Sequence, residues 1–342
     1  ILTGTYGTIG GGYANLVFGG GGTIAGGYEN GITGTATTVG GGLWNSALAD
    51  YATVAGGMLN AASGEEATVV GGYYNDATGL RSTIAGGYDS TASGEAAAVG
   101  GGHQNTASGY ATTVPGGKWS VAEGDYSFAA GRHAKANHDG CFVWADSTAA
   151  DLWCNLPDRT VFRSSGGFVI RTSSDLSSGA ELGAGSGTWA DLSDRNMKDN
   201  IKLVDGREVL ARLTEVPIST WNYTTQEPGI RHMGPMAQDF YAAFGLGEDD
   251  RHITTIDADG VALVAIQALA EENAELRGRI DDLEADMKEL RSLISEPAAP
   301  ARQRGLDFLL PGADLLLVGP GLLLAGLGMV WVTRRRGSGG GR

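Results

Sequence analysis

The chain has 342 residues, 57 of them glycine, and a formal net charge of −15. Because nucleic-acid binding needs clustered lysine and arginine to meet the phosphates, this charge excludes a nucleic-acid partner from the expected functions. Glycine does not recur at every third position and there are only 9 prolines, so a collagen helix is excluded as well. The chain begins with Ile1 rather than methionine, which predicts a fragment or a processed product.

A 15-residue repeat dominates the N-terminal part. Branched apolar residues recur at one phase, each followed by a glycine pair: Ile9, Ile24, Val39, Val54, Val69, Ile84, Val99 and Val114. A second phase carries Asn15, Asn30, Asn45, Asn60, Asn75 and Asn105, with Ser90 and Ser120 in the gaps. Two strands of about five residues joined by glycine-bearing turns use up about fifteen residues. Stacked coils would therefore place Val on Val and Asn on Asn, and a disordered linker would not keep this phase.

Residues 8–146 resemble the head repeats of trimeric autotransporter adhesins, because the period, the Gly-Gly pair and the Asn-x-Ala-x-Gly marker all match. The resemblance implies a left-handed parallel β-roll in a homotrimer, and hence a mainly β fold. We expect the roll to cover residues 1–147 and a connector to cover 148–192, with one apolar strand at 168–170.

Neither a metal nor a cofactor is expected in this chain. Gly116-Gly117-Lys118 lacks the spacing and the hydroxyl residue of a phosphate-binding loop. The spacing of His133, His138 and Cys141 matches no standard metal site, so we expect solvated loop residues there. Cys141 and Cys154 do not form a C-x-x-C pair, and the sequence leaves their pairing open.

The sequence pattern changes at LSDRNMKDN, residues 192–200, from a glycine-rich stretch to a charged segment with helical periodicity. Beyond it, periodicity predicts a helix over 207–213, a strand around 218–223 and a second helix over 237–244. The run 257–260 lacks the distal glutamate of a calcium loop and predicts a hairpin turn instead.

Residues 193 to about 275 resemble the C-terminal intramolecular chaperone of endosialidase tailspikes and phage tail fibres. The resemblance rests on Ser193-Asp194, Lys198, Asn200-Ile201, the run His232 to Asp239 and a closing helix from Val261. That family trimerises, guides the folding of upstream β-structure and cuts itself off before the motif serine. The resemblance implies an α+β domain over 193–265, with Ser193 as nucleophile, Lys198 as general base and Leu192–Ser193 as the scissile bond. Asp194, Asn196 and Asn200 are the expected supporting residues.

The spacing of Ser193 and Lys198 sets a geometric condition. Five positions separate side chains by about 140° on a helix and put them on opposite faces of a strand, so the two can meet only in a turn or across chains. A free lysine, with a pKa of about 10.4, must also be desolvated or lie near a cation such as Arg195 to act as a base.

A heptad over 266–296 predicts a coiled coil. Its seam is Ile266, Leu269, Asn273, Leu276, Ile280, Leu283, Met287, Leu290 and Ile294. Leucine at the d positions with isoleucine at most a positions favours a coiled coil of two helices. The coiled coil must share the symmetry of the trimeric roll, however, so we expect three helices. Asn273 would fix the register.

A linker at 297–313, an apolar span at 314–333 and a basic tail at 334–342 end the chain. Leu315 to Val332 carries no charge and Arg334 to Arg336 follow, which predicts a transmembrane helix with a cytoplasmic C-terminus and an extracellular or cell-surface head. A removable sorting tail is the open alternative.

Taken together, these features predict a trimeric, adhesin-like surface fibre that cleaves its own chain as a serine endopeptidase with a Ser-Lys dyad. The alternatives are a non-catalytic trimeric adhesin or stalk, or a phage-derived tail fibre, with an inactive dyad. The sequence identifies no host or surface ligand for the head.

Overall fold

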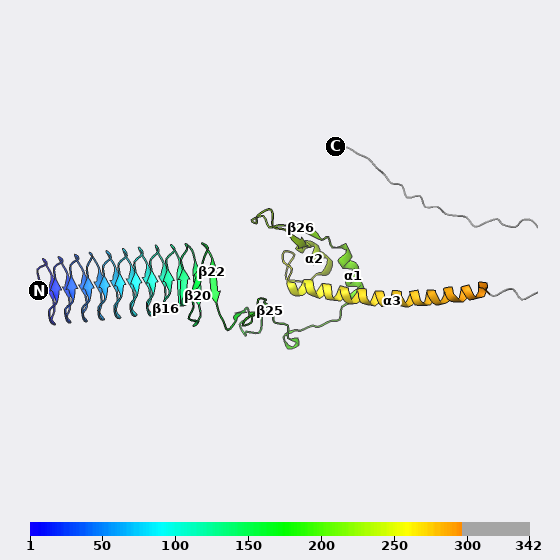
Figure 1. Ribbon diagram of the computed structural model, residues 1–342, viewed down its shortest axis with the longest axis horizontal. Coiled ribbons are helices and arrows are strands. Elements are labelled where there is room, and N and C mark those ends of the chain that lie inside the picture. The colour runs from blue at the N-terminus through cyan, green and yellow to red at the C-terminus, as the bar shows by residue number, and fades with distance from the viewer. Residues whose placement is uncertain (296–342) are drawn as a thin grey trace, which may run out of the picture. The chain divides into compact units, whose positions relative to one another are not determined.

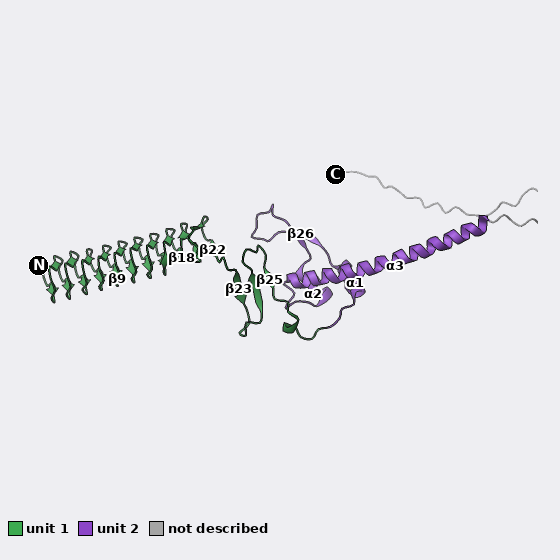
Figure 2. Cartoon of the chain, turned by 60° about the horizontal axis from the view of Figure 1, so that its bottom comes forward, with its two compact units in different colours: residues 1–201 green, residues 202–342 purple. Residues whose placement is uncertain are grey.

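The structure is a computed structural model that describes residues 1–295. Contacts divide the chain into two compact units, Ile1–Ile201 and a second that begins at Lys202 (Figure 2). The first unit holds the repeats, a small antiparallel sheet and loop 192–200. Over its described residues, 202–295, the second holds three helices and a two-stranded sheet.

The repeats form a parallel β-solenoid whose coils stack one on the next (Figure 1), each coil giving one strand to each of two sheets. The first sheet contains β1 (Thr8–Ile9), β3 (Thr23–Ile24), β5 (Thr38–Val39), β7 (Thr53–Val54), β9 (Thr68–Val69), β11 (Thr83–Ile84), β13 (Ala98–Val99), β15 (Thr113–Val114), β16 (Gly117–Lys118), β18 (Phe128–Arg132), β20 (Phe142–Ala145) and β22 (Thr160–Arg163). The second contains β2 (Leu16–Val17), β4 (Gly31–Ile32), β6 (Ser46–Ala47), β8 (Ala61–Ala62), β10 (Asp76–Ala77), β12 (Thr91–Ala92), β14 (Thr106–Ala107), β17 (Val121–Ala122), β19 (Ala134–Ala136) and β21 (Leu152–Cys154).

The predicted register is confirmed. Ile24 pairs with Ile9 on one side and with Val39 on the other, so the apolar ladder runs through the repeats. Ile24 and Val39 are fully buried between the two sheets, and Ile9 in the first coil is partly buried against them. From β1 to β17 the strands are two residues long rather than about five, because the backbone turns sharply at left-handed residues such as Trp44 (φ 52°) and Tyr51 (φ 60°).

The asparagine ladder is also present, and it is buried. Asn45 Nδ2 donates to the carbonyls of Gly41 at 2.9 Å and Gly57 at 2.8 Å, and Asn45 Oδ1 accepts the backbone N–H of Asn60 at 3.0 Å. The buried amide is thus satisfied, as burial of a polar group requires. Near this amide only glycine fits at position 42, since a Cβ on Gly42 would lie 2.2 Å from the Gly57 carbonyl oxygen.

The roll extends past its predicted end at residue 147. Phe142 pairs with Thr160, 18 positions on, and Ala134 pairs with Leu152. The expected connector at 148–192 therefore starts later, after Arg163. The boundary was wrong because longer turns interrupt the 15-residue phase while the parallel pairing continues.

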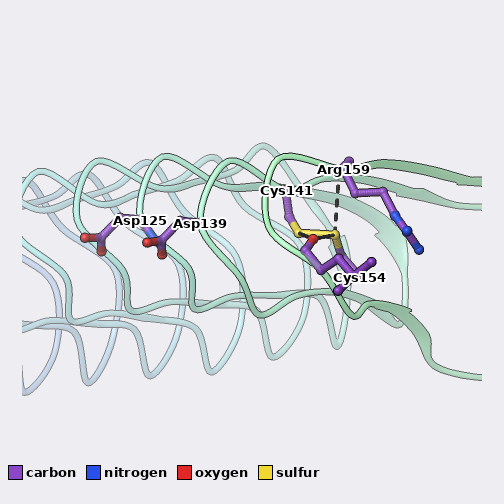
Figure 3. The surroundings of a disulfide bond; sticks show 6 residues. Asp125, Asp139, Cys141, Cys154 and Arg159 are labelled. Atoms are coloured by element: carbon purple, nitrogen blue, oxygen red, sulfur yellow. Dashed lines mark hydrogen bonds between the residues drawn. A yellow bond between two sulfur atoms is a disulfide. The ribbon is translucent and has the colours of Figure 1, made fainter. Parts of the chain in front are cut away.

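Cys141 and Cys154 form a disulfide that joins two neighbouring coils (Figure 3). Both are buried, so the expectation that Cys141 is a solvated loop residue was wrong. The Cys141 sulfur lies 3.3 Å from the Leu156 carbonyl oxygen. His133 Nδ1 lies 2.8 Å from Asp151 Oδ1. Within residues 1–295, no group of three His, Cys, Asp or Glu side chains is placed to hold a metal ion.

A three-stranded antiparallel sheet follows the roll: β23 (Phe168–Arg171), β24 (Gly179–Leu182) and β25 (Ala190–Asp191). The predicted strand at 168–170 is β23. The second unit contains α1 (Gly206–Glu215), β26 (Ser219–Trp221), β27 (His232–Gly234), α2 (Ala237–Phe244) and α3 (Thr255–Ser295), which confirms the expected helices and strand.

Helix α3 packs against α1 near its start. Ala265 and Ala268 are buried there, and a Cβ on Gly206 would lie 3.3 Å from Ala268 Cβ, so small residues allow the close approach. The predicted hairpin turn at 257–260 is wrong, since these residues lie in α3. Thr254 explains the difference, because its Oγ1 accepts the Asp257 N–H at 3.1 Å and so starts the helix.

The heptad lies within the single helix α3, and its seam is exposed beyond the contact with α1, with Leu276 and Ile280 each 52% exposed. A helix of this length is what the predicted coiled coil needs, but its pairing stays a prediction. No helix among residues 1–295 is long and apolar enough to span a membrane. The expected linker, membrane span and basic tail, at 297–313, 314–333 and 334–342, lie outside the described residues.

Candidate functional site

The loop Leu192–Asn200 is built around one short 3-10 helix, η1 (Arg195–Met197). Asp194 precedes it with extended backbone, and its Oδ1 accepts the Asn196 N–H at 2.9 Å. This is the bond by which aspartate caps a helix start. The Lys198 N–H closes the turn on the Arg195 carbonyl at 3.2 Å. The sequence therefore makes a tight turn between residues 193 and 198.

The turn brings the two predicted catalytic side chains together. Lys198 Nζ donates to Ser193 Oγ at 2.6 Å. Neither a continuous helix nor a strand would allow this contact at a separation of five residues. A turn was one of the two arrangements that the spacing allowed, and here the pair meets within one chain.

The supporting residues shape the loop instead of touching the lysine. Asn196 Nδ2 donates to Asp194 Oδ1 at 3.1 Å, so the two polar side chains are bonded to each other. Asn200 has a left-handed backbone (φ 55°), a conformation that asparagine tolerates better than most residues. Its N–H donates to Asp199 Oδ1 at 2.7 Å. Within residues 1–295, Ser193 is the acceptor that Lys198 Nζ contacts.

Ser193 and Lys198 are exposed to solvent. In the observed bond the ammonium donates to the hydroxyl, whereas a general base must accept the hydroxyl proton. Burial of a lysine favours the neutral amine, which is the form that can accept. The turn therefore supplies the contact between the two side chains, and the single chain leaves both of them exposed.

The residues before Ser193 are held as a strand. β25 pairs with β24, with Glu181 opposite Ala190 and Ala180 opposite Asp191, and Leu192 follows directly. Leu192 borders a cavity of about 190 Å³ that Arg171 and Glu181 also line. Arg171 Nη2 lies 3.6 Å from Glu181 Oε2 across the sheet.

Sequence reasoning did not single out Arg171 or Glu181. β23 begins with an unbroken apolar run and β24 is short and begins with Gly179 and Ala180, so no alternation of polar and apolar residues marked either strand. The signal that was available is Arg171 itself, a charged residue directly after the apolar run 168–170.

Ser193 is also the first residue of a segment that matches a known protein family. Residues 193–245 match the peptidase family described as chaperone of endosialidase. The match starts at Ser193 and confirms the resemblance over this part of the chain. Comparison with curated proteins gave no match. The stretch 193–245 is called the chaperone segment below.

The chaperone segment includes η1, α1, β26, β27 and α2, and ends at Gly245, whose left-handed backbone caps α2. The motif residue His232 lies in β27, with its ring 4.9 Å from that of Trp221 in β26. His232 Nε2 lies 3.0 Å from Gln226 Oε1. The predicted motif thus folds as a hairpin leading into a helix. The resemblance was expected to reach about residue 275, and the family match ends before α3.

Proposed function

We propose that this chain is a trimeric, fibre-like protein whose chaperone segment cuts the chain between Leu192 and Ser193. One coincidence carries the proposal. The family match begins at the same serine whose hydroxyl is bonded to Lys198 at 2.6 Å. A family named both peptidase and chaperone supports a role in assembly and, with it, self-cleavage.

The proposed reaction is an acyl shift followed by hydrolysis. Lys198, once neutral, takes the proton of Ser193 Oγ, and the oxygen attacks the carbonyl carbon of Leu192. The C–O bond forms, the Leu192–Ser193 C–N bond breaks, and the departing Ser193 nitrogen takes the proton from Lys198. Water then opens the ester, giving a carboxylate on Leu192 and restoring the Ser193 hydroxyl.

Mass spectrometry of the purified chain tests the cleavage. The expected fragments are residues 1–192 and a second that begins at Ser193. Ser193→Ala removes the nucleophile and Lys198→Ala removes the base, so each should leave the chain whole. Lys202→Ala and Ser186→Ala are matched controls, since each removes the same type of exposed side chain from a nearby position. A whole unaltered chain, or a Ser193→Ala chain cut at the same bond, would instead support a non-catalytic stalk.

Two features support the trimer. The matched family is described as a chaperone, and the heptad seam of α3 is exposed in a single chain, with Leu283 63% exposed. Burying such a seam against copies of itself is what stabilises a coiled coil. Sedimentation of the chain should give three copies, and a monomer would contradict the assembly.

A membrane anchor is proposed from the sequence alone, on the uncharged stretch Leu315 to Val332 and the three arginines that follow. It would make the chain a single-pass protein with its roll outside the cell. Carbonate extraction of membranes tests it, because a spanning protein stays in the pellet and a peripheral one is released.

A further inference from the structure

A series of aromatic rings connects the last coils of the solenoid to Trp189, three residues before Leu192. Phe128 and Phe142, opposite each other in β18 and β20, stack with centroids 4.6 Å apart. Phe142 lies 5.7 Å from Phe162 in β22, the last strand of the roll. Phe162 lies 5.5 Å from Phe168, the first residue of β23. Phe168 in turn meets Trp189 edge-to-face at 6.1 Å.

Trp189 is thus packed three residues before the scissile bond. The strand it leads into, β25, is only two residues long and pairs with β24 along one edge. Such a short edge strand is marginal on its own, and an aromatic contact adds about 0.5–1.5 kcal/mol beyond the buried area. The ring contact therefore fixes a segment that backbone pairing alone would hold weakly.

Fixing this segment matters for the chemistry. Ser193 Oγ attacks the carbonyl of the residue before it, so the reaction depends on the backbone angles at Leu192 and Ser193. Asp194 holds the chain on the C-terminal side of the bond through its cap on η1. On the N-terminal side, β25 and the Trp189 contact hold it. Misplacement of reacting groups by about 1 Å can cost about 100-fold in rate.

We propose that Trp189 is a positioning residue for self-cleavage, and that its contact with Phe168 makes cleavage depend on completed folding of the end of the solenoid. The inference rests on the proposed self-cleavage. The aromatic series reaches Trp189 only when β22 and β23 are both in place, because Phe162 and Phe168 lie on these two strands. A chain whose last coil is unfolded then keeps its chaperone segment attached.

The test follows the appearance of the 1–192 fragment with time during cell-free synthesis of the full chain. Trp189→Ala should slow cleavage about tenfold or more, and Trp189→Phe, which keeps an aromatic ring, should restore most of the rate. Trp153→Ala is the matched control, since Trp153 is an exposed tryptophan of β21 outside the series, and its cleavage rate should be unchanged.

A double-mutant cycle separates positioning from a general loss of structure. Phe168→Ala should slow cleavage as Trp189→Ala does, and the double variant should be no slower than either one, because both remove one contact. Trimerisation, measured by sedimentation, should persist in all of them. The inference is overturned if Trp189→Ala is cut at the unaltered rate, if Phe does not restore the rate, or if the variant no longer trimerises. An unaltered chain that stays whole overturns the proposed function as well, so the two failures can be told apart.

Discussion

Asn75 Oδ1 accepts the backbone N–H of Ser90 at 3.1 Å, and Ser90 Oγ accepts the Asn105 N–H at 3.3 Å, so Ser90 keeps the bond from one coil to the next but not the amide's other two bonds. Asn75 Nδ2 donates to the carbonyls of Gly71 and Gly87, whereas the Ser90 hydroxyl donates to the Tyr88 carbonyl at 3.3 Å. A serine is too short to reach both glycine carbonyls. The bonds to the two glycine carbonyls are therefore missing at this rung of the ladder.

Replacing Ser90 by asparagine should stabilise the solenoid. Ser90 is buried, and the new amide would have the carbonyls of Gly86 and Gly102 as acceptors, by analogy with its neighbours. A net gain of about 1 kcal/mol would raise the midpoint of thermal unfolding, followed by circular dichroism, by about 2–4 °C. The reverse change, Asn75→Ser, is the control and should lower the midpoint. Equal midpoints for all three chains would show that the ladder contributes little.

Replacing Ala36 by glycine should stabilise the roll, and replacing Ala25 by glycine should destabilise it. Both alanines are exposed, but Ala36 has a left-handed backbone (φ 53°), which costs a residue with a Cβ about 1–2 kcal/mol. Relief of this strain exceeds the roughly 0.5–1 kcal/mol that glycine costs in ordinary backbone. Thermal unfolding of the two variants should therefore shift in opposite directions, and a shift in the same direction would contradict the backbone argument.

Removing the disulfide should destabilise the last coils. Cys141→Ser together with Cys154→Ser opens a loop with a sequence separation of 13, for which loss of the cross-link costs about 3 kcal/mol. Thermal unfolding with and without a reducing agent measures the effect. Reductant should lower the midpoint of the unaltered chain and leave that of the double variant unchanged.

The end of the roll should lose stability in acid through Asp146. The Ser165 backbone N–H, and further bonds from Ser165, Arg163 and Thr148, hold the pKa of the Asp146 carboxyl well below its usual range. A carboxyl with a lowered pKa in the folded state contributes stability above its unfolded pKa of about 3.9 and loses it as the pH falls further.

The comparison for Asp146 is with Asp146→Asn, which cannot carry the charge. The difference in unfolding midpoint between the two chains should be constant above about pH 5 and should shrink steadily below about pH 4. Asp281→Asn, on the exposed surface of α3, is the control for the general effect of losing a carboxylate. A difference that stays constant down to pH 2 would mean that the bonds at Asp146 do not stabilise the fold.

Two lysines in the heptad seam should prevent assembly. Leu276→Lys with Ile280→Lys places charge where the coiled coil would bury apolar side chains. Ala285→Lys with Ser292→Lys adds the same charge to α3 outside the seam and serves as the control. Light scattering should show monomers for the first pair and the unaltered assembly for the second. Assembly of the seam variant would mean that the roll or the chaperone segment associates without the helix.

Periodic features were predictable from the sequence. Ile24 on Val39 and Asn45 on Asn60 follow from one phase that repeats many times, because each coil has to stack on the one before it. The long helix was also predictable, since the heptad over 266–296 marks it. The loop at 192–200 was found through a resemblance, which the match to residues 193–245 then confirmed.

Single contacts were decided by the tertiary structure. The meeting of Ser193 with Lys198 depends on the turn angles that the Asp194 cap imposes, and the spacing of five residues left open whether the two would meet within a chain or across chains. The disulfide and the end of the roll at Arg163 depend on coils whose turns no longer keep the 15-residue phase. In a repeated pattern the same packing requirement recurs in every coil, so the residue types alone are enough to predict the stacking. A contact that occurs once depends on the backbone path between its two residues, which only the folded chain determines.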